Sequence, residues 1–241
     1  MRYGILGDIH ANIQALDAVL GELARERVDH YISVGDIVGY GGDPTTCIDR
    51  VRSIKATVVA GNHDWAVVGK LDTSFFNVYA KAAVDWTASV LSADEKAWLA
   101  NLPLSTELEN HITVAHATVD APEHFDYIQT YYDAVRSINA MKTPVAFTGH
   151  SHVPVAFLVK DSLSLSMEAH ISLQGVHRAL VNVGSIGQPR DENPMAAFAL
   201  YDTQSREYEL RRVRYDIKGA CDRIRKVGLP AILAERLKFG R

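Results

Sequence analysis

Five short apolar segments, each followed by a small or polar residue, restrict the fold more than any other feature of this sequence. They are Tyr3–Leu6, Tyr31–Val34, Thr57–Ala60, Ile112–Ala115 and Val145–Thr148. Apolar runs of this length, bounded by turn residues, are typical of buried β-strands. Helical patterns separate several of them, and this alternation predicts βαβ units around a sheet that is buried on both faces.

The helical patterns are apolar residues that recur at spacings of three and four, which is the stripe of an amphipathic helix. They predict helices over Asn12–Arg27, Thr45–Ser53, Phe75–Leu91 and Ile217–Leu237, the last interrupted at Gly228-Leu229-Pro230. The segment Ser92-Ala93-Asp94-Glu95 has the pattern of a capping box. We therefore expect it to open a further short helix that runs through Leu99.

The pattern changes after Val159. Segments rich in strand-forming residues now follow one another with short connections, at Ser162–Leu173, Ala179–Val183, Ala196–Tyr201 and Glu207–Tyr215. They predict antiparallel pairs that complete a second sheet. No repeat or low-complexity linker divides the chain. We expect one domain over residues 1–241, with a helical insert at about 70–100 and C-terminal strands and helix at about 196–241.

Composition excludes several classes of protein. The 241 residues are 47% hydrophobic and 22% charged with a net charge of −4, so the basic excess of a nucleic-acid-binding domain is missing. No apolar run approaches the roughly 18 residues of a membrane helix. Met1–Leu6 is too short for the apolar part of a signal peptide, and the two cysteines, Cys47 and Cys221, suit reduced thiols. A cytoplasmic protein without nucleic-acid or membrane partners is expected.

Polar side chains that can bind metal follow all five apolar segments. They are Asp8, His10, Asp36, Asn62, His63, His116, His150 and His152. Ligands of open α/β sheets collect at the carboxyl ends of the strands. A single Asp or His at such a place is usually a cap or a structural residue, but eight at five successive strand ends predict a metal site. They are too many for one tetrahedral ion and about enough for two ions that share a carboxylate.

The motifs resemble, in order, the five-block signature of the calcineurin-like metallophosphoesterase superfamily. The blocks are Asp8-Ile9-His10, Gly35-Asp36, Gly61-Asn62-His63-Asp64, His116 and Gly149-His150-Ser151-His152. Together with the late segment Gly184–Arg190, they are most similar to the small prokaryotic, phosphodiesterase-like branch. The resemblance implies an α/β fold of two packed mixed β-sheets flanked by helices, a four-layer α/β/β/α sandwich.

The resemblance also implies a role for each strand-end residue. Asp8, His10 and His152 would hold one metal ion, Asp36 would bridge, and Asn62, His116 and His150 would hold the second. His63 would be the general acid that protonates the leaving alkoxide. The expected cofactors are two divalent transition-metal ions, Mn²⁺ first, with Fe, Zn²⁺, Ni²⁺ or Mg²⁺ as alternatives. Such a pair lowers the pKa of a bound water from 15.7 to about 7.

One departure from the superfamily pattern follows Asp36. Gly39 and Tyr40 stand where protein-phosphatase-like members have an Asp that orients the catalytic His and an Arg that binds phosphate. A phosphoprotein phosphatase is therefore not expected, and the group that orients His63 stays open. Arg190 is our hypothesis for the missing phosphate contact, with a structural surface pair as the alternative.

Further substrate contacts are less specific. Asn12 could contact substrate or cap the following helix, and Tyr40 could stack on a base or wall the cleft. Four residues after His116 could form a substrate wall, although packing is the simpler interpretation; they are His124, Tyr127, Tyr131 and Tyr132.

These observations predict a metal-dependent phosphoric ester hydrolase, a phosphodiesterase or phosphatase, that uses a metal-activated water on a small phosphoester or nucleotide. A dinucleoside-polyphosphate hydrolase is the first alternative, and the motifs do not separate it because the metal chemistry is the same. A catalytically silent metal-binding scaffold is the second. The complete set of ligands argues against it, since scaffolds lose such residues.

Overall fold

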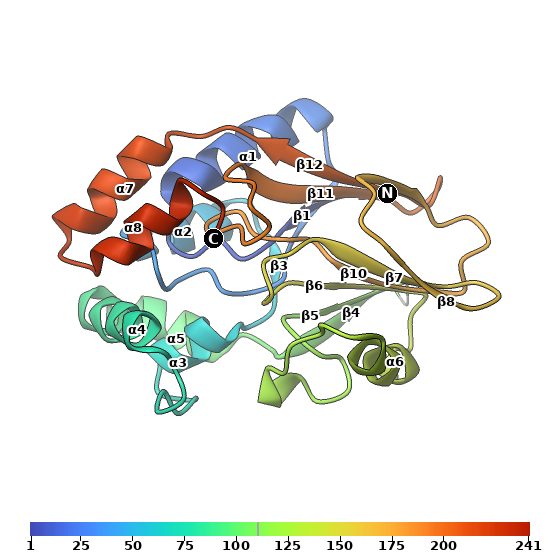
Figure 1. Ribbon diagram of the computed structural model, residues 1–241, viewed down its shortest axis with the longest axis horizontal. Helices are drawn as coiled ribbons and strands as arrows, with labels where there is room; N and C mark the ends of the chain where they lie inside the picture. The colour runs from blue at the N-terminus through green and yellow to red at the C-terminus, as the bar shows by residue number, and fades with distance from the viewer. Residues whose placement is uncertain (110) are drawn as a thin grey trace.

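The computed structural model describes all residues of the chain except residue 110 and contains two six-stranded mixed β-sheets with helices on their outer faces (Figure 1). The first sheet has the order β3-β2-β1-β11-β12-β9 and the second β4-β5-β6-β10-β7-β8. This confirms the predicted four-layer α/β/β/α arrangement. The strands of the first sheet are β1 (Arg2–Leu6), β2 (His30–Ser33), β3 (Thr57–Val58), β9 (His170–Ser172), β11 (Ala196–Asp202) and β12 (Glu207–Val213). Those of the second are β4 (Ser105–Leu108), β5 (Ile112–Ala115), β6 (Val145–Thr148), β7 (Val155–Val159), β8 (Leu163–Ser166) and β10 (Arg178–Asn182).

The five predicted strands all form, but they belong to two sheets rather than one. β1, β2 and β3 are parallel neighbours in the first sheet, whereas β5 and β6 are parallel neighbours in the second. The inner faces of both sheets share a core, with Ile5 and Ile32 from one side and Val145 and Phe147 from the other. Apolar runs alone could not reveal this division, because a strand buried between two sheets and one buried between sheet and helices have the same composition.

The C-terminal strands also differ from the prediction, since they complete both sheets. β11 pairs antiparallel with β1, and β12 and β9 follow it, while β10 and β7 extend the second sheet. The predicted strand Ser162–Leu173 is two strands, because β8 pairs with β7 and β9 pairs with β12 of the other sheet. The chain thus crosses from one sheet to the other within this segment.

Helices cover the outer faces of the sandwich. They are α1 (Ile13–Glu26), α2 (Pro44–Ser53), α3 (Asn62–Val67), α4 (Val78–Val90), α5 (Ala93–Ala100), α6 (Tyr131–Ala140), α7 (Ile217–Lys226) and α8 (Ala231–Leu237), with a 3₁₀ turn, η1, at Pro122–His124. α1, α2 and α5 contribute to a core against the first sheet, and α6 packs on the second. None of the helices in the described part of the chain has the length and apolarity that a membrane crossing requires.

Several helix boundaries follow the predicted signals. Ser92 and Glu95 form the reciprocal capping box of α5, and the break between α7 and α8 falls at Gly228-Leu229-Pro230. α4 begins later than predicted, because the side chain of Asn77 accepts hydrogen bonds from the first turn and caps the helix there. Phe75 therefore lies in the loop before α4. β4, β7, α3 and α6 were not predicted.

Candidate metal centre

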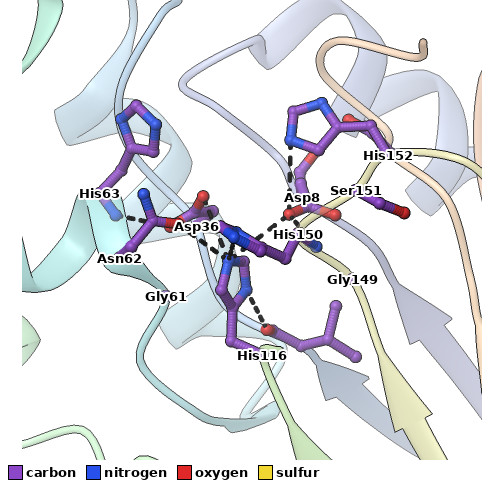
Figure 2. A network of polar contacts seen from close by, with 12 residues as sticks. Asp8, Asp36, Gly61, Asn62, His63, His116, Gly149, His150, Ser151 and His152 are labelled. Carbon is purple, nitrogen blue, oxygen red and sulfur yellow. Dashed lines mark hydrogen bonds and ion pairs between the residues drawn. The ribbon is translucent and has the colours of Figure 1, made fainter. Parts of the chain in front are cut away.

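The structure brings the eight predicted strand-end residues to one place, where the parallel strands of both sheets end. Figure 2 labels all of them except His10. All eight side chains are buried. Asp8 and His10 follow β1, Asp36 follows β2, and Asn62 and His63 open α3 just after β3. His116 follows β5, and His150 and His152 follow β6. The packing of the two sheets therefore joins the five motifs, which the chain separates by more than a hundred residues.

The donor atoms fall into two groups that share one carboxylate. Asp8, His10, Asp36 and His152 form the first group, and Asp36, His116 and His150 the second, with the donors of each group within 4.8 Å of one another. Asn62 joins the second group, since its Oδ1 lies 3.2 Å from Nε2 of His116. His63 belongs to neither group.

Backbone carbonyls orient the imidazoles of the first group. Nδ1 of His10 donates to the carbonyl of Val38 at 3.0 Å, and Nδ1 of His152 donates to that of Gln188 at 2.6 Å. A neutral imidazole that donates from Nδ1 has a lone pair on Nε2, and the two Nε2 atoms lie 3.0 Å apart. Two lone pairs at this separation repel each other unless a cation lies beside them. The arrangement fits a metal ion, with the carbonyls as outer partners that fix the ligands.

The second group is ordered in the same way. Nδ1 of His116 donates to the carbonyl of Val34 at 2.8 Å, and its Nε2 faces Nδ1 of His150 at 3.1 Å. Nε2 of His150 is buried and has no hydrogen-bond partner among the described residues. Nε2 of His116 and Nδ1 of His150 again converge on a point that suits a cation.

Asp36 lies at the centre of this arrangement. Its Oδ2 is 3.4 Å from Nε2 of His116 and 3.6 Å from Nε2 of His10, while Oδ1 accepts a hydrogen bond from the backbone N–H of His63 at 2.8 Å. The chain at Gly61 passes so close that a Cβ there would overlap the Asp36 carboxylate. The close approach requires glycine at this position and holds the carboxylate between the two groups.

The ligand loops adopt unusual backbone conformations. His10, Asp36, His150 and His152 have φ values of 48°, 49°, 67° and 61°, in the left-handed region that non-glycine residues seldom occupy. Such conformations persist where the surrounding structure enforces them, and they are concentrated at functional sites.

Burial and neighbouring charges shift the pKa values of the histidine and aspartate side chains in the centre. Burial by itself lowers the pKa of His116, but the Asp36 carboxylate outweighs it and the pKa rises to about 9. Burial raises the pKa of Asp8 to about 6 against the attraction of His116. Burial by itself raises the pKa of Asp36. The imidazoles around it, His116 first, outweigh this effect and hold its pKa well below the usual range. Without a metal, a proton on His116 supplies part of the positive charge that the carboxylates require.

His63 is positioned by aromatic rings. Its imidazole lies 4.5 Å from the ring of Tyr40 and 5.2 Å from that of Phe76, measured between centroids, and its edge meets His10. A Cβ at Gly39 would overlap Nδ1 of His63, so the ring occupies the space next to the backbone at position 39. The imidazole of His63 thus packs between the rings of Tyr40 and Phe76. Burial lowers the pKa of His63 to about 4.

Asp64 is a residue that sequence reasoning left without a role. It is buried, and its carboxylate accepts hydrogen bonds from the N–H groups of Ile37 at 3.0 Å, Val38 at 3.3 Å and Gly61 at 3.0 Å. It therefore ties the loop after β2 to the loop after β3. An acidic residue in the first turn of a short helix is the signal that could have identified it.

The three tentative substrate contacts have different surroundings. Arg190 and Tyr40 line the cleft in front of the centre, and Nη2 of Arg190 donates to Tyr40 Oη at 3.3 Å and to Gln188 Oε1 at 3.2 Å. Asn12 is buried instead, where its Oδ1 caps α1 and its Nδ2 donates to the carbonyl of Gly187 at 3.0 Å. Both ends of the Asn12 amide are thus used inside the fold.

An open cleft of about 390 Å³ gives access to the centre. It is lined by Asp36, Tyr40, Asn62, His63, Leu71, Asp72, Phe75, Phe76, Asn77, Ala80, His124, Phe125, Tyr127, His150, His152 and Arg190. Of the aromatic residues expected after His116, Tyr127 lines this cleft, and Tyr131 and Tyr132 do not. The candidate ligands and the aromatic walls together form a concave site of a size that suits a small molecule.

Comparisons with known proteins identify the family of this chain. The model of the calcineurin-like phosphoesterase superfamily domain matches residues 1–206. An uncharacterized protein of Methanocaldococcus jannaschii is 37% identical over 98% of this chain and 97% of its own length. A crystal structure of a metallophosphoesterase from Sphaerobacter thermophilus has 34% identity and a TM-score of 0.87 over 100% of this chain and 99% of its own. A hypothetical protein from Pyrococcus horikoshii shares the fold, with 21% identity and a TM-score of 0.82 over 100% and 98% of the two chains.

The chain therefore belongs to the calcineurin-like phosphoesterase superfamily, and it is a hydrolase that acts on phosphoester bonds. The resemblance drawn from the five motifs is confirmed.

Proposed function

We propose that this protein is a metal-dependent phosphodiesterase or phosphatase that hydrolyses a small phosphoester or nucleotide at a dinuclear metal centre. The observation that supports this most is the pair of buried donor groups that share Asp36. One carboxylate between two ligand sets is the arrangement expected for two cations roughly 3.5–4 Å apart.

The seven proposed ligands divide as the donor groups do. Asp8, His10 and His152 would hold one ion, Asn62, His116 and His150 would hold the other, and Asp36 would contribute to both. Carboxylate, amide and imidazole donors without thiolate favour Mn²⁺, with Fe, Zn²⁺, Ni²⁺ or Mg²⁺ as alternatives. When bound, the two ions lower the pKa of a water molecule and neutralise charge on the phosphoryl oxygens.

Arg190 binds a phosphoryl oxygen beside the centre. Its Nε is buried without a hydrogen-bond partner among the described residues, and its guanidinium lies 5.7 Å from the centre of the Tyr40 ring. A guanidinium that already has one edge fixed, here by Tyr40 and Gln188, loses little conformational freedom when it binds an anion. Tyr40 in this proposal positions Arg190 and closes one wall of the cleft.

His63 donates a proton to the departing alkoxide. This requires a protonated imidazole, whereas burial lowers the pKa of His63 to about 4. A bound anionic phosphate acts in the opposite direction, because a nearby negative charge favours the protonated form. Phe76 and Tyr40 hold the ring while the proton is transferred.

Reconstitution tests the proposal. The metal-stripped protein is loaded with Mn²⁺, its metal content is measured, and the same preparation is assayed on p-nitrophenyl phosphate, bis(p-nitrophenyl) phosphate, cyclic nucleotides and diadenosine tetraphosphate. We expect about two ions per chain and turnover of at least one ester. Metal binding without turnover of any of them, with any of the transition metals, would instead support the silent scaffold.

We propose that residues 1–241 form one domain that works in the cytoplasm. The pairing of β1 with β11, close to opposite ends of the chain, supports a single unit. Cys47 and Cys221 are free and buried, which suits a reducing compartment.

A further inference from the structure

The cleft extends away from the metal centre along a wall of aromatic side chains. Five of its lining residues are Phe or Tyr, namely Tyr40, Phe75, Phe76, Phe125 and Tyr127. They come from three separate segments: the loop after β2, the loop between α3 and α4, and the segment between β5 and α6. The last two segments lie on the same, lower side of the molecule in Figure 1.

Two of these rings are exposed although they line a cleft. Phe75 is 92% exposed and Tyr127 is 45% exposed. By contrast, Tyr40 and Phe125 are buried, and their rings pack against His63 and His116. A phenylalanine that is almost fully solvated contributes little to the stability of the fold, so Phe75 is available for a ligand.

Tyr127 links this aromatic surface to the reaction centre. Its ring stacks on the imidazole of His150, with centroids 4.1 Å apart and planes inclined by 23°. His150 is one of the proposed metal ligands. A phosphoryl group at the centre therefore places its substituent within the reach of Tyr127.

The charges along the cleft favour a substrate with few phosphates. Among the lining residues that the structure describes, Arg190 is the single Arg or Lys, and Asp72 adds a negative charge to the same cleft. A polyphosphate chain that extended along these lining residues would contact no Arg or Lys besides Arg190, and it would approach the carboxylate of Asp72. An uncharged, flat group meets no such penalty.

We infer that the cleft binds a phosphoester that carries a planar aromatic group, and that this group stacks on Phe75 and Tyr127. The inference rests on the proposed hydrolysis of small phosphoesters and narrows the substrate class. The aromatic group is a nucleobase or another aryl substituent. A dinucleoside polyphosphate fits the cleft less well.

Binding of phosphonates tests the inference without turnover, because their carbon–phosphorus bond is not a phosphoester. Benzylphosphonate and cyclohexylmethylphosphonate have the same number of carbon atoms, and only the first is flat and aromatic. Titration calorimetry on the Mn²⁺-loaded protein should show that benzylphosphonate binds about three- to tenfold more tightly, the range expected for an aromatic contact beyond apolar burial. Equal affinities would overturn the inference.

Variants locate the contact. Phe75→Ala and Tyr127→Ala should each bring the ratio of the two affinities, benzylphosphonate over cyclohexylmethylphosphonate, close to one. Phe75→Tyr should retain the preference for benzylphosphonate. Tyr132→Ala is the matched control, because Tyr132 is 73% exposed and lies outside the cleft. A preference that survives both alanine variants, or that is lost in Tyr132→Ala, would contradict the assignment to Phe75 and Tyr127.

A second pair of ligands separates the two sources of the aromatic group. The 5′-phosphonate analogue of adenosine monophosphate is compared with the corresponding ribose 5-phosphonate. Tighter binding of the adenosine compound supports a nucleobase, and a preference limited to benzylphosphonate supports another aryl group. Turnover of the esters used to test the proposed function, measured on the same preparation, keeps the two proposals apart. Turnover of any of them without an aromatic preference removes only this inference, and absence of turnover of all of them removes the proposed function.

Discussion

The Nε2 atoms of His10 and His152 lie 3.0 Å apart although 142 residues separate them in the chain. Each imidazole is held from behind by a backbone carbonyl, so neither can turn its lone pair away without losing a buried hydrogen bond. The fold therefore holds two electron-rich atoms together before any cation arrives. Such preorganisation raises metal affinity, because little conformational freedom is lost on binding.

Asp36→Asn should lose most of both metal ions. The two donor groups share this carboxylate, so its replacement by an amide removes a negative charge from each. Metal analysis after dialysis should find well under one ion per chain. Asp85→Asn is a control, since Asp85 pairs with Lys81 on the surface of α4 and should leave the metal content at the level of the unmodified protein. Full retention of two ions in Asp36→Asn would exclude a bridging role.

His63→Ala should keep both metals and lose rate according to the leaving group. General acid catalysis contributes about 10²–10⁴-fold where the leaving group needs a proton. A loss in this range is expected for alkyl esters and a small one for p-nitrophenyl esters, whose leaving group is stable as an anion. Kinetics on the two classes of ester, with metal analysis on the same preparations, measures both effects. An equal loss of rate on both classes, or a loss of metal, would contradict the assignment of His63 as the general acid.

Arg190→Ala should lower kcat/KM by about 10–100-fold, because a charge-assisted hydrogen bond to a phosphoryl oxygen is worth about 1.5–3 kcal/mol. Arg190→Lys should recover only part of this, since an ammonium group lacks the planar fork. Arg241→Ala is the control, because the Arg241 side chain is 70% exposed and pairs with Glu192 on the surface. An unchanged kcat/KM for Arg190→Ala would favour the structural alternative.

Gly39→Ala should disturb His63 directly. Both Gly39 (φ +88°) and Gly69 (φ +74°) have left-handed backbones, but an added Cβ overlaps His63 at Gly39 and meets nothing within 4 Å at Gly69. Each substitution should cost roughly 1 kcal/mol of stability from backbone strain. Only Gly39→Ala should also lower kcat on alkyl esters. Thermal unfolding and kinetics of the two variants separate strain from displacement of the imidazole, and matching kcat values would show that position 39 does not affect His63.

Metal affinity should rise with pH. In the metal-free protein Asp36 raises the pKa of His116 to about 9, so this imidazole is protonated below that pH. A cation must displace the proton, and binding therefore releases protons and becomes tighter as the pH rises toward 9. Protonation of Asp8, whose pKa is raised to about 6, should weaken binding further below that pH. Calorimetry of Mn²⁺ binding in buffers of different ionisation enthalpy measures the released protons, and a pH-independent affinity between 6 and 9 would contradict the coupling.

Local patterns in the sequence were sufficient for most of the elements and for the candidate ligands. Short apolar runs produce strands, the stripe in Asn12–Arg27 produces α1, and the capping box at Ser92 starts α5, because each depends on residues a few positions apart. The strand-end residues could be recognised because chemistry restricts which side chains bind metal. The resemblance then divided them as the two donor groups of the structure do, and their roles as ligands stay a prediction.

Tertiary structure alone decided how these pieces meet. The assignment of β1 and β6 to different sheets, the break of Ser162–Leu173, and the enclosure of His63 by Tyr40 and Phe76 all depend on contacts between distant segments. No local pattern encodes such contacts, because strand partners and ring neighbours are selected by the burial of whole faces. The surroundings of Gly39 depend on tertiary contacts in the same way. The space beside Gly39 is filled by the imidazole of His63, and the rings of Tyr40 and Phe76 pack against that imidazole.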